Sequence, residues 1–363
     1  MNRRTFVAGL AAAGMAHAAT APHVLAQTAA DAPLSVLGAA WRLWTARHLD
    51  PSGRVVDALQ DRASHSEGQG YGLTLAALMG DQNAALSIVS WTEDNLAVRD
   101  DGLLAWRWFP DRADPIADRN NASDGDLFYA WGCLLAGRAF GRGDLVERAN
   151  DITATLVAKC VVADPRGNGR LLFVPAVDGF QRDDSVVINP SYAMPRAMEE
   201  LASAAGEPRL ADTARDCVSM LNDLAVDGTT PDWMLITPEG PQVDEVLSDR
   251  TGYEAIRVPL FLIWSGLTPN AMVERHRAVA VAAEPRPGIA PTVFERTTGT
   301  VLERSNDVGY QALSALLGCG ERGGSNPFLP IPPFGAPQPY YPATLHMMSL
   351  VAQLDRYPGC VPL

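Results

Sequence analysis

The sequence predicts an all-α protein in which helical hairpins surround a common core. Three observations favour this fold class. Helix-like segments follow one another along the chain, their linkers are rich in Gly, Pro and Asp, and stretches typical of strands are few and scattered. Because no alternation of strands with helices is visible, a doubly wound sheet is disfavoured. The segments also show no sequence repeat that would indicate a solenoid.

About eleven segments carry apolar residues at the spacing of a helix. In chain order they are 34–49, 70–79, 83–98, 127–140, 145–160, 192–205, 210–224, 253–264, 271–283, 308–317 and 344–354. The first of them contains Trp41 and Trp44. Two stretches, 170–176 and 233–237, are typical of brief strands. The segment 320–342 is rich in Pro and Gly, and we expect a loop there that wraps the domain.

The bulk composition excludes several classes of protein. The chain has 363 residues, of which 47% are hydrophobic and 20% charged, as in a globular protein. A formal net charge of −13 repels phosphate backbones, so nucleic acid is not expected as a partner, whereas a neutral polysaccharide is not repelled. Lys159 is the only lysine and has no glycine loop around it, which excludes a P-loop nucleotide site.

Residues 1–26 are predicted to be a cleaved export signal and not part of the fold. Arg3 and Arg4 belong to a sequence that resembles a twin-arginine motif, and the apolar stretch 7–16 follows them. Ala18 and Ala26 end two candidate cleavage sites. The apolar stretch is too short for a permanent membrane span. We therefore expect a periplasmic or secreted protein in which residues 27–363 form a single domain.

The cysteines and histidines do not have the spacing of a metal site. No Cys-x-x-Cys pair is present, and the four histidines that follow the signal are far apart. We therefore expect neither a metal nor a cofactor. Cys319 and Cys360 lie in loop-like stretches near the C-terminus and are a candidate disulfide pair in an oxidising compartment. The other three cysteines are expected to be small buried apolar residues.

Glu67 is the carboxylate of the first motif that could carry chemistry, residues 64–72 with the sequence SHSEGQGYG. It stands among small residues at the start of a helix, where glycines let another molecule approach the backbone closely. An ordinary helix start, with Ser64 or Ser66 as the cap, is the structural alternative. The glycine spacing and the lack of a preceding strand exclude a dinucleotide-binding loop.

Asp124 and Asp126 belong to the second motif, residues 120–126 with the sequence NNASDGD. An aromatic, helix-like segment follows directly. Side chains two residues apart on a helix diverge, so one aspartate can cap the helix while the other points elsewhere. Two capping carboxylates are the structural alternative. A metal-binding Asp-x-Asp has less support, because the spacing of a calcium-binding EF-hand loop does not follow.

Glu254 and Arg257 belong to the third motif, residues 252–259 with the sequence GYEAIRVP. They are three residues apart and share one face of a helix, so a surface ion pair is the structural alternative. Trp106, Trp108 and Tyr192 are candidate sugar-stacking rings, because the C–H faces of sugars pack on aromatic rings. Each ring could equally belong to the core, as we expect for Trp131 and Trp264, which lie inside helical patterns.

Taken together, the three motifs resemble those of glycoside hydrolase family 8. The sequences SEGQGYG, ASDGD with its aromatic helix, and YEAIRV occur in the order typical of the family. The resemblance covers roughly residues 34–257 and is thin towards the C-terminus. Within the family it is strongest to the periplasmic cellulases that accompany bacterial cellulose synthase, through the sequences at 91–92, 95–96 and 189–192.

The resemblance implies an (α/α)6 barrel with a few short strands in loops. It also implies an endo-β-1,4-glucanase that hydrolyses cellulose with inversion, possessing no permanent membrane span and linked to the cellulose synthase machinery. By motif position Glu67 is the general acid and Glu254 the base, while Asp124 holds and distorts the sugar and tunes Glu67. The substrate-binding residues that it implies are Trp106, Trp108, Asp126, Tyr192, Tyr253 and Arg257.

Glu254 departs from the family pattern, in which the most similar members have Tyr-Asp-Ala-x-Arg. Its extra methylene moves the carboxylate by about one bond, and a misplacement near 1 Å can cost on the order of 100-fold in rate. Three interpretations remain open: the backbone compensates, another acid such as Asp249 is the base, or the enzyme is slow. We favour compensation. A family 8 xylanase or chitosanase, or a non-catalytic glucan-binding protein that has lost its base, are the alternatives.

Overall fold

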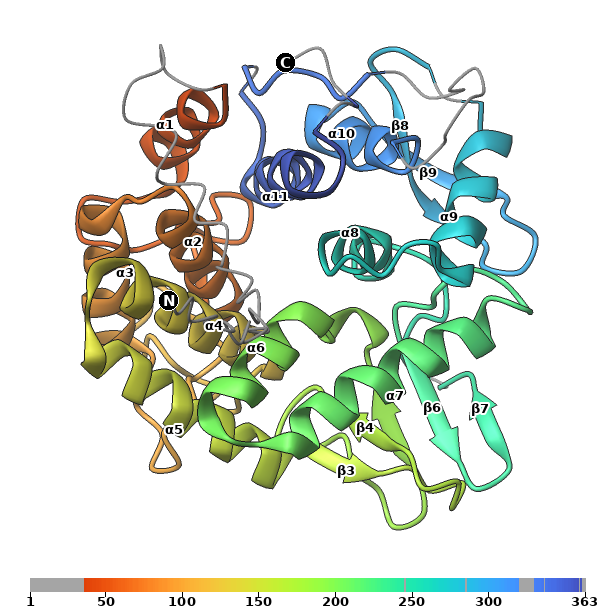
Figure 1. Ribbon diagram of the computed structural model, residues 1–363, viewed down its shortest axis with the longest axis horizontal. Helices are drawn as coiled ribbons and strands as arrows, with labels where there is room; N and C mark the ends of the chain where they lie inside the picture. The colour runs from red at the N-terminus through yellow and green to blue at the C-terminus, as the bar shows by residue number, and fades with distance from the viewer. Residues whose placement is uncertain are drawn as a thin grey trace, which may run out of the picture.

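The computed structural model describes residues 36–358 and Cys360, apart from 245, 285, 320–329 and 336. The predicted export signal therefore lies outside the described residues. Within them the chain forms eleven α-helices (Figure 1). These are α1 (Val36–His48), α2 (Ser66–Leu78), α3 (Gln82–Asn95), α4 (Ser123–Phe140), α5 (Gly143–Cys160), α6 (Pro195–Ala205), α7 (Pro208–Leu224), α8 (Val258–Trp264), α9 (Ala271–Ala282), α10 (Val308–Leu316) and α11 (Tyr340–Arg356).

The helices form an (α/α)6 barrel. Helices α2, α4, α6, α8 and α11 each contact the next, and α11 returns to contact α2, so they close an inner ring. Helices α3, α5, α7 and α9 pack outside this ring against their neighbours in sequence, and α1 packs on α11 (Figure 1). The all-α prediction is confirmed, and each of the predicted helical segments overlaps one of these helices.

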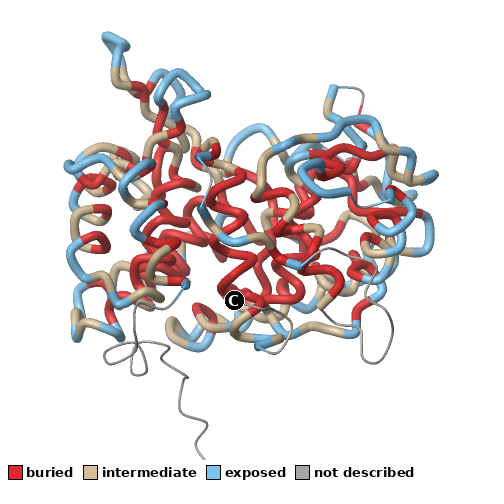
Figure 2. The backbone as a smooth tube through the Cα atoms, turned by 90° about the horizontal axis from the view of Figure 1, so that it is seen from above, coloured by how far each residue is buried: buried red, intermediate tan, exposed pale blue. Residues whose placement is uncertain are grey.

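The burial of the helices explains which of them are inner. In α4 and α11 nearly every side chain except those of the last turn is buried, as expected for helices surrounded by other helices. Helix α7 instead buries a single stripe, which includes Leu210, Ala214, Cys217 and Leu221. Figure 2 shows the buried residues concentrated in the interior and the exposed ones at the periphery.

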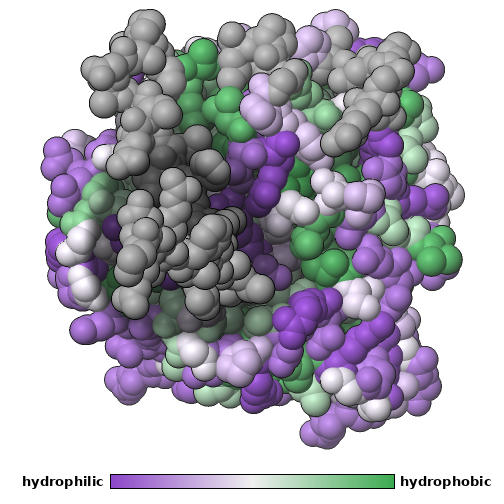
Figure 3. Space-filling view, viewed as in Figure 1, coloured by the Kyte–Doolittle hydropathy of each residue, from purple (hydrophilic) through white to green (hydrophobic). Residues whose placement is uncertain are grey.

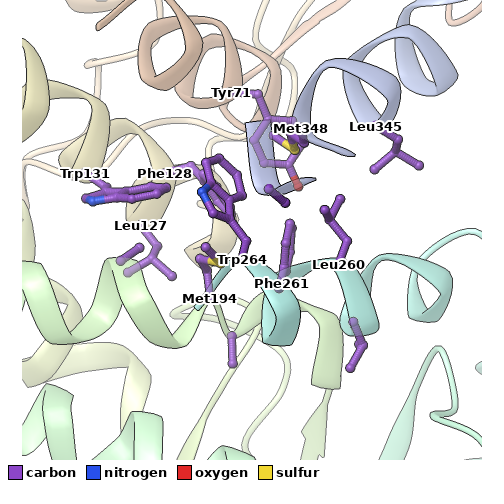
Figure 4. Close-up of a cluster of buried hydrophobic side chains, with 14 of the residues drawn as sticks. Tyr71, Leu127, Phe128, Trp131, Met194, Leu260, Phe261, Trp264, Leu345 and Met348 are labelled. Atoms are coloured by element: carbon purple, nitrogen blue, oxygen red, sulfur yellow. The ribbon is translucent and has the colours of Figure 1, made fainter. Parts of the chain in front are cut away.

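Aromatic and sulfur-containing side chains fill the centre of the barrel (Figure 4). The rings of Phe128 and Phe261 are 5.4 Å apart, as are those of Trp131 and Trp264. Both tryptophans are 1% exposed, so their prediction as core residues is confirmed. On the face seen in Figure 3, where described residues form the surface, hydrophilic residues dominate and hydrophobic ones form small separate patches.

Two glycines bring the starts of α2 and α4 together. A Cβ atom on Gly70 would lie 2.7 Å from the backbone nitrogen of Tyr129, and one on Gly125 would lie 2.1 Å from Oγ of Ser66. Both positions therefore exclude any side chain. As a result, the first turns of the two helices, which carry Glu67 and Asp124, lie side by side.

In the part of the chain that the structure describes, four small antiparallel sheets lie in the connections between helices. They are β1 (Ser64–His65) with β2 (Arg107–Trp108), β3 (Val161–Ala163) with β4 (Leu171–Phe173), β5 (Val186–Ile188) with β6 (Met234–Thr237) and β7 (Gly240–Gln242), and β8 (Ala290–Phe294) with β9 (Val301–Ser305). The predicted strands at 170–176 and 233–237 contain β4 and β6. The β8–β9 hairpin was not predicted.

The described cysteines fall into two groups. A disulfide joins Cys319, just beyond α10, to Cys360, just beyond α11, which confirms the candidate pair. Cys133, Cys160 and Cys217 are free thiols and buried, as expected. Among the helices of the described residues, none is long and apolar enough to cross a membrane.

Candidate active site

Arg257 stands at the centre of a cluster of three carboxylates. Its Nη1 donates to Oε2 of Glu67 over 2.6 Å, and its Nη2 donates to Oε2 of Glu254 over 2.6 Å and to Oδ2 of Asp124 over 3.2 Å. The Arg257 side chain is 1% exposed and that of Asp124 is 3% exposed, whereas those of Glu67 and Glu254 are 23% and 37% exposed. The structure therefore brings the three predicted catalytic carboxylates together.

Neutral groups hold the guanidinium from its other side. Nε of Arg257 donates to Oγ of Ser191 over 3.1 Å, and Nη1 also donates to the hydroxyl of Tyr71 over 3.0 Å. Ser191 in turn donates to Oδ1 of Asn189 over 2.7 Å. The ring of Tyr192 lies 5.7 Å from the guanidinium carbon. Because all the donors of Arg257 that face the cluster are engaged, the guanidinium is fixed in one orientation.

The three carboxylates come from the starts of three helical elements. Glu67 lies in the first turn of α2 and Asp124 in the first turn of α4. Glu254 directly precedes the 3-10 helix η3 (Ala255–Arg257), which leads into α8. The positive end of a helix dipole favours a nearby anion, so each element supports the charge of its carboxylate.

The cluster cannot easily be fully ionised, because it holds three carboxyls against one guanidinium. Burial raises the pKa of Asp124 well above its usual range, and the neighbouring Glu67 carboxylate raises it further. Both effects favour the protonated form of the Asp124 carboxyl, while the positive charge of Arg257 opposes them.

An open cleft of about 260 Å³ lies over the cluster. Trp106, Tyr192 and Tyr253, which were predicted to bind substrate, line it together with the three predicted catalytic carboxylates and Arg257. The ring of Trp106 stacks on His65, with 6.1 Å between centroids and 27° between planes. Burial lowers the pKa of His65 to about 4, so this imidazole is neutral near pH 7. The cleft thus combines flat rings with carboxylates, a lining that suits a sugar chain.

Three predicted residues lie elsewhere. Trp108, in β2, packs edge-on against Trp91 and does not line the cleft. Asp126 is fully buried; its carboxylate accepts from the backbone nitrogen of Leu104 over 2.8 Å and from Nδ2 of Asn121 over 2.9 Å. It therefore faces away from the cleft and holds a loop, as the diverging side chains of its motif allow. Asp249, the alternative base, is exposed and outside the cleft lining.

Several residues of the site escaped prediction. Ser191 contacts both Arg257 and Asn189, yet a serine in a short polar stretch carries no signal of its own. Tyr340 and Tyr341 enter the cleft from the start of α11, far beyond the region of resemblance. Asp232 binds the turn that carries Glu254 through backbone groups only, a contact that no sequence pattern indicates.

The described residues offer no alternative centre of metal chemistry. Among them, no three His, Cys, Asp or Glu side chains are grouped so that they could hold a metal ion. The site thus has two accessible carboxylates, Glu67 and Glu254, on different nitrogens of one guanidinium, and a third, buried carboxyl, Asp124, on the nitrogen that also binds Glu254. Such an arrangement can supply one acid and one base to a bond lying in the cleft.

Comparison with known proteins agrees with this arrangement. Residues 13–354 match the model of the family described as "Glycosyl hydrolases family 8". A Novacetimonas hansenii protein named "Probable endoglucanase" is 29% identical over 352 residues, which cover 95% of this chain and 98% of that protein. An endoglucanase of Xanthomonas axonopodis pv. citri is 32% identical over 302 residues, covering 80% of this chain and 77% of the relative.

A solved structure shares the fold over nearly its whole length. The endo-β-1,4-glucanase CMCax from Acetobacter xylinum superposes with a TM-score of 0.78 at 27% identity, covering 90% of this chain and 99% of that structure. The matched region includes the three motifs and the helices that carry them. The chain is therefore a glycoside hydrolase and belongs to glycosyl hydrolase family 8.

Proposed function

We propose that this protein is an endo-β-1,4-glucanase that hydrolyses cellulose or a related β-1,4-glucan with inversion. One observation carries the proposal: Arg257 holds Glu67 and Glu254 on its two terminal nitrogens at the floor of an open cleft. The relatives named as endoglucanases support the choice of a glucan. A cleft that is open, and not a closed pocket, suits attack within a long chain.

In the proposed reaction Glu67 is the general acid. It gives its proton to the glycosidic oxygen as the bond from that oxygen to the anomeric carbon breaks. The sugar that fills the cleft displaces water and strengthens the interactions among the carboxyls. Asp124, which is buried beside Glu67, binds a sugar hydroxyl, favours a distorted ring and tunes the acid.

Glu254 is the proposed base. It takes a proton from the water that attacks the anomeric carbon from the opposite face, so the product has the inverted configuration. Of the cluster carboxylates it is the most exposed, and Oε2 is held by Arg257 while it lies 3.4 Å from the Ser191 hydroxyl. These contacts orient the longer side chain. They support the interpretation that Glu254 works as the base over the alternative that the base has been lost.

The polymer and the acid can be tested together. The chain from residue 27 onwards is assayed for release of reducing ends from carboxymethyl-cellulose, xylan and chitosan, with Glu67→Gln alongside. We expect activity on the cellulose derivative that falls by about 1,000-fold or more in the variant. Glu93→Gln is the matched control, because Glu93 also pairs with an arginine, Arg148, but lies outside the cleft lining. Unchanged activity of folded Glu67→Gln would overturn the acid assignment.

One observation favours a second polymer, chitosan. Among the described residues, the cleft is lined by four carboxyl side chains, Asp57, Glu67, Asp124 and Glu254, against the single guanidinium of Arg257. This excess of negative charge attracts a cationic amino-sugar chain. Faster release from chitosan than from the cellulose derivative would decide for it, and a preference for xylan would likewise replace the glucanase proposal.

We also propose that residues 1–26 export the protein to the periplasm or beyond, where it trims glucan made by the cellulose synthase machinery. The paired arginines and the apolar stretch support export. Replacing Arg3 and Arg4 by lysine should retain the protein in the cytoplasm, as judged by cell fractionation. If cells producing Glu67→Gln make cellulose of normal amount and chain length, the link to synthesis is wrong.

A further inference from the structure

Asp232 binds the short turn that carries the proposed base. Its Oδ1 accepts from the backbone nitrogen of Gly252 over 3.0 Å and from that of Ala255 over 2.8 Å. These two donors flank Tyr253 and Glu254 in the sequence. The backbone N–H of Glu254 interacts with the same carboxylate. Asp232 thus plays the part of a helix cap supplied from another segment, 22 residues before the base.

Contacts on both sides fix the position of this turn. A Cβ atom on Gly252 would lie 2.3 Å from Oδ2 of Asp232, so the carboxylate sits directly against the backbone there. On the other side, Oε2 of Glu254 is bound by Nη2 of Arg257. The backbone of the base is therefore fixed by Asp232, and its carboxylate end is fixed by Arg257.

We propose that Asp232 is a positioning residue for Glu254. It fixes the position of the turn so that the longer glutamate side chain reaches the attacking water, and its negative charge makes Glu254 a stronger base. This inference rests on the proposed function of Glu254. It also gives a physical basis for the compensation that the glutamate requires, because the position of the backbone makes up for the extra methylene of the side chain.

The charge of Asp232 is unusual for a buried carboxylate. It is 9% exposed, and no described arginine, lysine or histidine forms an ion pair with it. Burial and, less strongly, the negative charge of Glu254 raise its pKa to about 6 in spite of the backbone hydrogen bonds. This repulsion is mutual, so the negative charge of an ionised Asp232 also acts on the Glu254 carboxylate.

Other groups near Glu254 also bear on its titration. The charged and titratable side chains that interact with it are Arg257, Asp124, Asp232, Tyr192 and Tyr341. Burial raises the pKa of both tyrosines well above the usual range, so they stay neutral throughout the relevant pH range. Arg257 stays charged. Asp124 and Asp232 are thus the groups whose ionisation can change the behaviour of the base near neutral pH.

The variants Asp232→Asn and Asp232→Ala separate charge from position. In Asp232→Asn the amide oxygen still accepts both backbone bonds, so we expect kcat at the plateau to stay within about threefold of the wild-type value. The acidic limb of the kcat/KM profile should move to lower pH by roughly 0.5–1 unit, because the base loses a repelling neighbour. In Asp232→Ala the turn is released, and kcat should fall by about 100-fold with little change in KM.

Matched variants complete the test. Asp164→Asn alters another buried carboxylate that accepts a backbone bond, from Arg166, outside the cleft; it should leave the pH profile unmoved. Glu254→Gln must be nearly inactive. If Glu254→Gln turned over at the wild-type rate, both the assignment of Glu254 as the base and the proposed role of Asp232 would be wrong. An inactive Glu254→Gln, with an unmoved acidic limb in folded Asp232→Asn, would overturn the role of Asp232 alone.

Discussion

Nη1 of Arg257 lies 2.6 Å from Oε2 of Glu67, although 190 residues separate the two in the sequence. The ion pair joins two sides of the inner ring, since Glu67 lies in the first turn of α2 and Arg257 directly precedes α8 on the opposite side. It also links the proposed acid to the proposed base, because the second nitrogen of the same guanidinium holds Glu254.

Arg257→Lys should therefore cost far more activity than a conservative charge swap suggests. A lysine keeps the charge but cannot donate to two carboxylates from a planar fork, so we expect kcat/KM to fall by about 100- to 1,000-fold with the fold retained. The assay is hydrolysis of soluble β-1,4-glucan, with thermal unfolding as the fold check. Arg196→Lys is the control, because Arg196 also bridges two carboxylates, Glu200 and Asp355, outside the cleft lining. Equal losses in both variants would contradict the account.

Glu254→Asp tests the compensation directly. If the backbone of the turn has adapted to a glutamate, the shorter side chain falls short of the attacking water, and kcat should drop by about 10- to 100-fold. The measurement is steady-state kinetics at the optimum pH, with Glu254→Gln as the reference for a lost base. An increase in kcat on shortening would mean that the glutamate is misplaced and that the enzyme is a slow one.

Asp124 and Asp126 should give opposite phenotypes although they are two residues apart. Asp124→Ala removes a carboxyl of the cluster and should abolish most activity with a modest effect on folding. Asp126→Ala leaves the backbone nitrogen of Leu104 and the amide of Asn121 without partners in the interior. The free energy of unfolding should fall by about 2–4 kcal/mol, while kcat and KM stay near the wild-type values. Denaturant titration and steady-state kinetics check this prediction. A raised KM in folded Asp126→Ala would show that Asp126 contributes to substrate binding.

His276 should make the fold less stable in acid. It is buried, and its Nε2 accepts from the backbone nitrogen of Thr230, so it is neutral in the folded protein. Burial lowers its pKa from 6.5 to about 3. Between these values the unfolded chain binds a proton that the folded chain does not, so the stability from this group is present above pH 6.5 and is lost as the pH falls.

His276→Gln removes that titration and measures it. Glutamine can still accept the Thr230 bond, so the difference in unfolding free energy between the two proteins should change by roughly 2–3 kcal/mol from pH 7.5 to pH 4.5, in favour of the variant. Denaturant titrations at the two pH values provide the numbers. A difference that does not depend on pH would show that His276 titrates alike in both states.

The helices could be predicted from the sequence because their buried faces carry apolar residues at helical spacing. Their starts could not, since the first turns of α2 and α4 are polar where they meet the cleft. Helix α2, for example, begins at Ser66, four residues before the predicted segment 70–79. Hairpin β8–β9 escaped because one strand is buried throughout and the other is mostly exposed, so neither alternates.

The carboxylates of the site could be predicted from their motifs, but the groups that hold them could not. Arg257 was expected to bind substrate, and its contacts with all three carboxylates were not predicted. Ser191 and Asp232 act through hydrogen bonds to distant segments, and these contacts form only when the barrel is folded. Trp108 was predicted to bind substrate: it lies two residues from Trp106, which lines the cleft, but its own ring packs against Trp91.

The stereochemistry of the first product tests the central claim most directly. Proton NMR follows the anomers released as the mature chain hydrolyses a soluble β-1,4-gluco-oligosaccharide, before mutarotation equilibrates them. An acid and a base that act from opposite faces predict that the α-anomer appears first. Initial release of the β-anomer would show retention, and it would contradict the assignment of Glu67 and Glu254 as an inverting acid and base pair.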